Sequence, residues 1–273
     1  MSGALVDGLV WEVRVRGDGV PLLLLHGFTG RGSSWGAHAT AFAREFRVVV
    51  VDLPGHGRSG IPSDPARASV ERSADDLASI LDREHCTPAH VLGYSLGARI
   101  ALRLAAVHPG VVRRLVLESP SAGPASEAER AARRAADAQR ADRLERNGIR
   151  AFVREWEHEP VLAGLLELPR AKAEQLRALR LRNSAAGLAA SLRGAGQGSM
   201  EPLHGRLAAI RAPTLVITGA LDRVGRGRAD VVVAGIPGAK LAVIAEAGHT
   251  PHLESPAAFR SLATSFLKEN SAA

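Results

Sequence analysis

Residues 90–99, HVLGYSLGAR, give the strongest indication of the fold. A short apolar run leads into Gly93-Tyr94-Ser95-Leu96-Gly97, a G-x-S-x-G sequence, and residues with helical periodicity follow. The turn from strand to helix in such a motif is so tight that small residues must flank the serine. It lifts the serine hydroxyl above the sheet edge, next to a helix N-terminus. The sequence therefore predicts that Ser95 is a reactive serine.

Short runs rich in Val and Leu alternate with helical stretches on both sides of this motif. The predicted strands are Pro21–Leu25, Arg47–Val51, His90–Leu92, Arg114–Leu117, Pro213–Gly219 and Lys240–Ile244. The predicted helices are Glu71–Arg83, Leu96–Ala106, Arg226–Ala234 and Pro256–Lys268. Continuous apolar strands that alternate with helices are typical of a parallel sheet buried on both faces. We therefore predict an α/β fold with a mostly parallel sheet.

The pattern changes in the middle of the chain. From Ser126 to Leu207 there are almost no β-like runs, and the good helix formers Ala, Arg, Glu and Leu dominate. Because the alternation resumes afterwards, this stretch is expected to be a helical insertion into one sheet. The predicted organisation is a core of residues 1–120 and 208–273, with residues 121–207 forming a helical cap over Ser95.

A reactive serine needs a base, and the base needs an orienting carboxylate. His249 follows the last predicted strand, so its loop is expected at the same sheet edge as Ser95. Asp222 follows the strand that ends at Gly219, and the order Ser95, Asp222, His249 is one that such a serine turn uses.

Other residues compete for these roles. His252 is a second candidate base, and Glu118, at the end of another strand, is a reserve acid. Asp222 could instead cap the helix that follows it. His26 and His56 fall in loops at the same edge and are interpreted as hydrogen-bonded loop histidines.

The sequence also predicts an oxyanion hole. The loop His26-Gly27-Phe28-Thr29-Gly30 follows a predicted strand, and its backbone N–H at Phe28 can point above Ser95. The N–H of Leu96 is the expected partner, because it follows the nucleophile at the start of a helix.

Composition limits the alternatives. The chain has 273 residues, 46% of them apolar, one cysteine and a formal charge of +7. Cys86 alone excludes an internal disulfide framework and a thiolate metal cluster and is expected in the core. No signal peptide and no apolar run long enough to span a bilayer is evident, so we expect a cytoplasmic protein without membrane insertion. The excess Arg lies along 121–211 without an RNA-binding motif, which favours an anionic small molecule over nucleic acid.

The motifs HGFTG, DLPGHGRS, GYSLGAR, GALD and AGHTPHLE occur in the order of the α/β-hydrolase superfamily, which the chain resembles over nearly its whole length. This resemblance implies an eight-stranded type of sheet with helices on both faces and a helical cap. GYSLGAR, LVLESPSAG, ERAARR, FVREWEHEPV and LRALRLRNSAAGLAASLRG resemble a more specific group. That group is the synthases of 2-succinyl-6-hydroxy-2,4-cyclohexadiene-1-carboxylate (SHCHC) in menaquinone biosynthesis.

The resemblance to the SHCHC synthases implies a lyase that eliminates pyruvate from 2-succinyl-5-enolpyruvyl-6-hydroxy-3-cyclohexene-1-carboxylate. It implies that a Ser–His–Asp triad acts as a proton-abstracting base, with no metal and no organic cofactor. The residues that it carries onto this chain as substrate-binding are Tyr94, Arg99, Arg133, Trp156 and Arg180. Three arginines suit a tricarboxylate, because three buried negative charges without partners would be prohibitive.

Two points of the match are open at the sequence level. Arg130 and Arg134 flank Arg133, so the register of that arginine is uncertain. A Lys-Phe pair often follows the triad aspartate in these synthases, whereas Arg223-Val224-Gly225 follows Asp222 here. Arg223 or Arg226 could replace the missing charge.

The triad does not fix the reaction. An ordinary serine hydrolase, acting on an ester or a carbon–carbon bond, would use the same residues. A non-catalytic small-ligand receptor on this fold is a third and weaker alternative. The sequence does not indicate an oligomeric state.

Overall fold

A computed structural model describes residues 2–269 of the chain. An eight-stranded sheet runs through it in the order β1-β2-β4-β3-β5-β6-β7-β8. The strands are β1 Ser2–Val6, β2 Leu9–Arg16, β3 Pro21–Leu25, β4 Arg47–Val51, β5 Ala89–Tyr94, β6 Val112–Glu118, β7 Thr214–Gly219 and β8 Lys240–Ile244. β1 and β2 are antiparallel to their neighbours, and the other strands pair in parallel. This confirms the predicted α/β class with its mostly parallel sheet.

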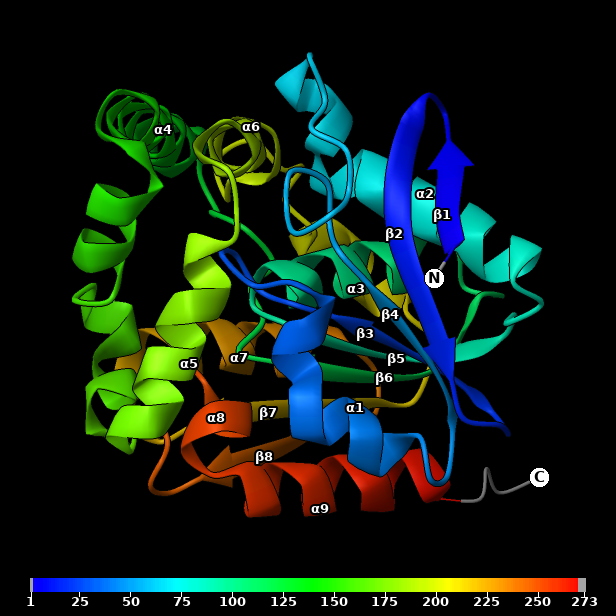
Figure 1. Ribbon diagram of the computed structural model, residues 1–273. Coiled ribbons are helices and arrows are strands. Elements are labelled where there is room, and N and C mark those ends of the chain that lie inside the picture. The colour runs from blue at the N-terminus through cyan, green and yellow to red at the C-terminus, as the bar shows by residue number, and fades with distance from the viewer. Residues whose placement is uncertain (1, 270–273) are drawn as a thin grey trace.

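Helices cover both faces of the sheet (Figure 1). The α-helices of the core are α1 Gly36–Phe42, α2 Val70–Arg83, α3 Leu96–Val107, α7 Arg223–Gly235, α8 Pro251–Glu254 and α9 Pro256–Lys268. Apolar residues of α2, α3 and α7 pack in one buried cluster with one face of the sheet, and those of α1 and α9 pack with the other. Central strands that are buried on both faces explain the continuous Leu and Val runs of β3 and β4.

The chain between β6 and β7 is helical, and no strand falls in residues 121–207. Its elements are α4 Glu127–Trp156, α5 Arg170–Leu181 and α6 Ala185–Ala195, with the 3-10 turns η3 Pro160–Glu167 and η4 His204–Ala209. Figure 1 shows α4, α5 and α6 gathered beyond one end of the sheet. Leu144, Phe152 and Leu188 belong to a small buried cluster that joins α4 to α6.

Helix α4 is interrupted at Gly148, whose φ of 76° is non-helical. Glycine adopts this left-handed region without the steric cost of a Cβ atom. The kink separates an amino-terminal half that carries Arg133 from a carboxyl-terminal half that ends at Trp156. The two halves therefore run in different directions.

Outside the insertion, the sequence expectations miss β1, β2, α1 and the short helix α8, together with the 3-10 turns η1 Gly32–Trp35 and η2 Pro65–Ala68. Elsewhere the ends agree closely, and β3, β4, β8 and α9 begin and end at the predicted residues. Cys86 is buried as expected. No helix in the described part of the chain is both long and apolar enough to cross a membrane.

Candidate active site

Ser95 lies on a strained turn between β5 and α3. Its φ of 50° and ψ of −103° fall outside the regions that ordinary residues favour. A Cβ atom on Gly93 would lie 2.4 Å from the carbonyl oxygen of Gly97, and one on Gly97 would lie 2.3 Å from that of Leu25. Glycine is therefore required on both sides of the serine, as the motif predicts.

Three side chains from separate loops join in one hydrogen-bonded chain. His249 Nε2 lies 3.1 Å from Ser95 Oγ, and His249 Nδ1 lies 2.6 Å from Asp222 Oδ2. The loops after β5, β7 and β8 supply the three residues at the carboxyl edge of parallel strands. This is the geometry that lets a histidine accept a proton from a serine.

Asp222 both caps a helix and contacts the histidine. Its Oδ1 accepts a hydrogen bond from the backbone N–H of Gly225 at 2.8 Å, while Oδ2 faces His249. Burial works against ionisation of Asp222, but the hydrogen bond and charge of His249 outweigh it, so its pKa lies below the usual value. The two sequence readings of Asp222 are thus compatible, since each uses a different oxygen.

The His249 loop is fixed from two directions. Ser119 Oγ donates to the carbonyl oxygen of His249 at 2.9 Å. Glu254 accepts hydrogen bonds from the backbone N–H groups of Gly248 and Thr250, at 2.6 and 2.8 Å. A Cβ atom on Gly164 of η3 would lie 2.1 Å from Oε2 of Glu254, so η3 approaches this carboxylate closely.

The competing base and acid are bound to each other. Glu118 is fully buried, and its Oε1 contacts both Nδ1 and the backbone N–H of His252 at 2.8 Å. Leu53 N donates to His26 Nε2, and His56 Nδ1 contacts the carbonyl oxygen of Pro54. His252, Glu118, His26 and His56 therefore all have structural contacts away from Ser95.

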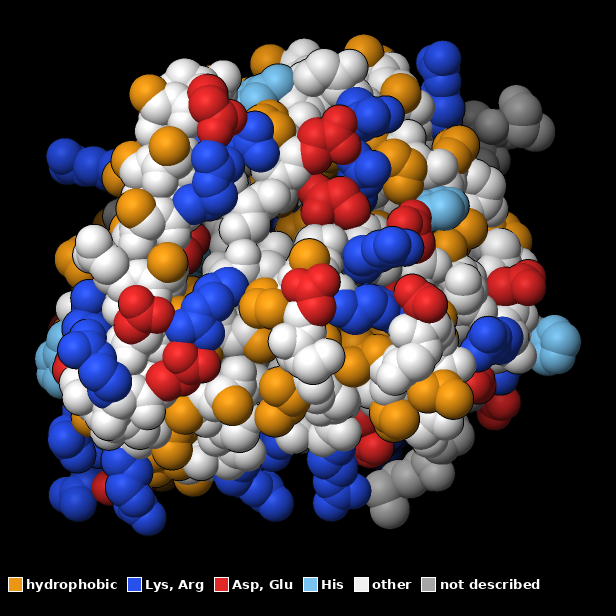
Figure 2. Space-filling model, turned by 90° about the horizontal axis from the view of Figure 1, so that it is seen from above, with side chains coloured by type: hydrophobic (Ala, Val, Ile, Leu, Met, Phe, Trp, Pro, Cys, Tyr) orange, Lys and Arg blue, Asp and Glu red, His pale blue; other side chains and the backbone are white. Residues whose placement is uncertain are grey.

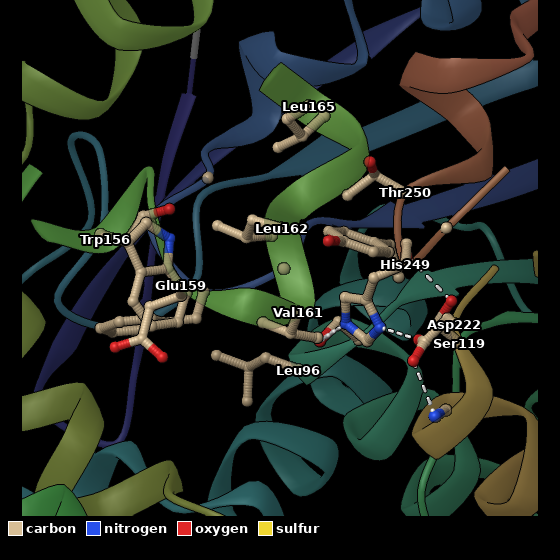
Figure 3. Close-up of a pocket in the computed structure, with 18 of the residues that line it drawn as sticks. Leu96, Ser119, Trp156, Glu159, Val161, Leu162, Leu165, Asp222, His249 and Thr250 are labelled. Atoms are coloured by element: carbon tan, nitrogen blue, oxygen red, sulfur yellow. Dashed lines mark hydrogen bonds and ion pairs between the residues drawn. The ribbon is translucent and has the colours of Figure 1, made fainter. Parts of the chain in front are cut away.

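A cavity of about 820 Å³ opens above Ser95. It is lined by the core loops after β3, β5, β6, β7 and β8 and by residues of α4, η3, α5 and α6. Figure 3 shows Trp156 and Glu159 on one side of the cavity and His249 and Asp222 on the other. Phe28 and Leu96, whose backbone N–H groups the sequence assigns to an oxyanion hole, also line it.

The three arginines carried over by resemblance all line this cavity. Arg99 is buried and donates through Nη1 to the carbonyl oxygen of Ala195 at 2.7 Å. Burial lowers its pKa to about 10, a value at which it remains charged near neutral pH. Arg180 is also buried, and burial is the largest cause of its lowered pKa. Its Nη1 lies 3.6 Å from Glu157, and its Nε lacks a hydrogen-bond partner.

Of the three neighbouring arginines Arg130, Arg133 and Arg134, Arg133 is the one that lines the cavity. Its Nε lies 3.3 Å from Asp137 Oδ2, within the cavity lining. Arg130 binds Glu127, and Arg134 binds Glu127 and the carbonyl oxygen of Gly198, outside the lining. The position of Arg133 at the cavity therefore favours it over Arg130 and Arg134 as the candidate ligand contact.

Aromatic residues complete the lining. Trp156 stacks on Phe152, meets Phe28 edge to face, and lies under the guanidinium of Arg140. The Tyr94 ring is 5.7 Å from that of His249, and burial raises the pKa of its phenol.

The structure adds cavity residues that the sequence pattern gives no reason to single out. They are Asp137, Arg140, Glu159 and Arg228. Arg226 forms an ion pair with Asp230 on its own helix and does not line the cavity, so it does not replace the missing charge near Asp222. Arg223 also lines the cavity and, like Arg228, has an exposed side chain. Arg226 and Arg228 are two residues apart on α7, so their side chains leave the helix on different faces, and only Arg228 of the two lines the cavity.

Comparison with known proteins agrees with this fold. Residues 20–256 match the family described as alpha/beta hydrolase fold, and the chain belongs to that family. Within it, the chain is 33% identical over 237 residues to the SHCHC synthase of Klebsiella pneumoniae subsp. pneumoniae, covering 87% of this chain and 89% of the relative. A Bacillus subtilis (strain 168) protein to which that activity is provisionally assigned is 34% identical over 263 residues, or 96% of each chain.

Solved structures of related proteins have the same fold. The structure of MenH from S. aureus superimposes with a TM-score of 0.89 at 33% sequence identity, covering 94% of this chain and 97% of that one. A thermophilic esterase from Thermogutta terrifontis superimposes with a TM-score of 0.83 at 27% identity, covering 97% and 96%. The fold is therefore shared by proteins with different named activities.

Proposed function

We propose that this protein is an SHCHC synthase, a lyase that eliminates pyruvate from 2-succinyl-5-enolpyruvyl-6-hydroxy-3-cyclohexene-1-carboxylate. The observation that carries the proposal is the meeting of Arg99, Arg133 and Arg180 in one cavity above Ser95. A substrate with three carboxylates needs cationic partners when it leaves water, and the planar guanidinium group fits a carboxylate through paired hydrogen bonds. The relatives named as SHCHC synthases support the same assignment.

In this proposal residues 121–207 act as a cap on a core of residues 1–120 and 208–273. The core supplies Ser95, Asp222 and His249, and the cap supplies Arg133, Trp156 and Arg180. Tyr94 and Arg99 belong to the core and complete the substrate site. The protein acts in the cytoplasm on a small anionic molecule, without a metal or organic cofactor.

The serine acts as a base in this reaction. His249 accepts the proton of Ser95, and the serine oxygen removes a hydrogen from the substrate ring as a proton. The hydrogen leaves the carbon that carries the succinyl group, and the electron pair of that C–H bond forms one ring double bond. The existing ring double bond shifts by one position, and the C–O bond to the enolpyruvyl group breaks. Pyruvate leaves as its enolate and takes up a proton. The N–H groups of Phe28 and Leu96 stabilise the negative charge that grows on a carbonyl oxygen of the substrate.

Asp222 holds the imidazole in the tautomer that carries its proton on Nδ1, so that Nε2 is free to accept. The 2.6 Å contact between His249 Nδ1 and Asp222 supports this role. The lowered pKa of Asp222 keeps it ionised throughout the neutral range. The carboxylate therefore stabilises the imidazolium that forms when the serine loses its proton.

The test compares two reactions of the purified protein. Pyruvate release from the enolpyruvyl substrate is followed with lactate dehydrogenase and NADH, and ester hydrolysis is followed with p-nitrophenyl acetate. We expect pyruvate release that Ser95→Ala abolishes, and no covalent adduct on Ser95 by mass spectrometry. Rapid ester turnover through an acyl-serine, without pyruvate release, would instead assign a serine hydrolase. Tight ligand binding without either reaction would assign a receptor.

A further inference from the structure

Arg228 is a cavity arginine with no carboxylate of its own. It lies on α7, in the second turn after Asp222, and lines the same cavity as Arg133 and Ser95. Among residues 2–269, the side chain of Arg228 forms no ion pair with a carboxylate and no hydrogen bond. Its neighbour Arg226, by contrast, binds Asp230 at 2.9 Å. The two arginines of one helix are therefore used differently.

Helix geometry explains why Arg228 points into the cavity. Residues three apart lie on one helix face, so Arg228 shares its face with Gly225. Helical side chains also lean toward the N-terminus of their helix, and the N-cap residue of α7 is Asp222. Gly225 has no side chain to obstruct the path. A long side chain at 228 can therefore extend over Gly225 toward the cavity.

The acids near Arg228 already have other partners. Loss of hydration is the largest cause of the lowered pKa of Arg228, followed by the like charge of Arg133, while Asp222 partly opposes both. Arg133 and Arg228 in turn lower the pKa of Arg99, which Asp137 and Glu71 partly oppose. Asp137 pairs with Arg133, and Asp222 is engaged by His249 and Gly225. In the described part of the chain, Arg228 is therefore left without an ion-pair partner.

We propose that Arg228 is a fourth substrate-binding arginine, and that it binds one carboxylate of the ligand together with Arg133. Arg133 belongs to α4 of the helical insertion and Arg228 belongs to α7 of the core. A ligand carboxylate between them gives Arg228 the anionic partner that the described residues do not provide, and it joins the helical insertion to the core across the cavity. The identity of the tricarboxylate rests on the proposed function, but the clamp itself requires only an anionic ligand.

The test uses tricarballylate, a simple tricarboxylate, in isothermal titration calorimetry with the wild-type protein, Arg228→Gln and the matched control Arg226→Gln. We expect the wild type to bind, Arg226→Gln to bind equally well, and Arg228→Gln to lose on the order of ten- to hundredfold in Kd. Circular dichroism melting should show that the wild-type protein and both variants are folded, because neither arginine side chain of α7 is buried in the core. Equal Kd values for Arg228→Gln and the wild type, or no binding by the wild type, would overturn the clamp.

A double variant tests whether the two arginines share one carboxylate. If they do, Arg133→Gln and Arg228→Gln together cost less affinity than the sum of the single losses, because either loss already disrupts the shared contact. Additive losses would contradict the shared carboxylate. Tricarballylate binding that depends on Arg228, in a protein that releases no pyruvate, would keep the clamp and reject the lyase.

Discussion

Asp222→Asn tests how Ser95 is activated. In the native site Oδ1 accepts from Gly225 N at 2.8 Å and Oδ2 lies 2.6 Å from His249 Nδ1. Asparagine has one acceptor oxygen and a donor NH2 group, so it cannot satisfy both contacts. If it keeps the bond from Gly225, its NH2 faces His249. The imidazole must then carry its proton on Nε2, and it can no longer accept the proton of Ser95.

The size of the effect follows from these contacts. A histidine held in the wrong tautomer lowers kcat on the order of 10⁴-fold, or about 5.5 kcal/mol of transition-state stabilisation. The opposite amide orientation would place NH2 against the N–H of Gly225 and remove the helix cap, at about 1 kcal/mol of folding stability. We therefore expect a collapse of kcat with KM nearly unchanged and only a small drop in Tm.

The assay is steady-state pyruvate release with melting curves recorded in parallel. Asp230→Asn is the matched control, because that exposed carboxylate lies on the same helix and pairs with Arg226. It should leave kcat and KM at wild-type values. An Asp222→Asn variant that keeps its kcat within about tenfold of the wild type would show that the carboxylate does not set the tautomer of His249, and the mechanism would have to be abandoned.

Two further predictions concern stability. Burial lowers the pKa values of His26 and His56 to about 4 and about 3, while unfolded histidine titrates near 6.5, so only the unfolded chain binds these protons between those values. The free energy of unfolding should fall as the pH drops from about 6.5 toward 4, by up to about 1.4 kcal/mol per pH unit for each histidine. A Tm that is constant from pH 7.5 to 5 would contradict this prediction. Gly97→Ala places a Cβ atom 2.3 Å from the carbonyl oxygen of Leu25 and should cost about 1–3 kcal/mol in urea unfolding. Gly110→Ala, with open space around it, is the control, and equal losses would argue against the close contact at Gly97.

Much of the sheet could be predicted because its central strands are buried on both faces. The runs at Pro21–Leu25 and Arg47–Val51 are apolar apart from Arg47 at the start of the second, so polar or turn residues mark their ends. β2, by contrast, has a half-buried pattern that includes the exposed Val10. Such a strand can be recognised only together with the strands that it pairs with, and local composition does not indicate that pairing.

The serine, histidine and aspartate could be located because each follows a strand of a parallel sheet, and all such ends meet at one edge. The arginines could not be sorted in the same way. Arg130, Arg133 and Arg134 lie close together on one exposed helix, and helical phase relative to the cavity decides which faces the ligand. Arg228 carries no sequence signal, because what distinguishes it is a position at the cavity with no carboxylate in ion-pair contact among the described residues.

The contact between Glu254 and Gly164 constrains how this protein can change in evolution. Glu254 holds the loop of His249 through two backbone N–H groups, while η3 passes so close that a Cβ atom on Gly164 would lie 2.1 Å from Oε2. A larger residue at 164 therefore displaces the carboxylate that holds the histidine. Positions 164 and 254 should co-vary among relatives, with glycine retained at 164 wherever glutamate stands at 254.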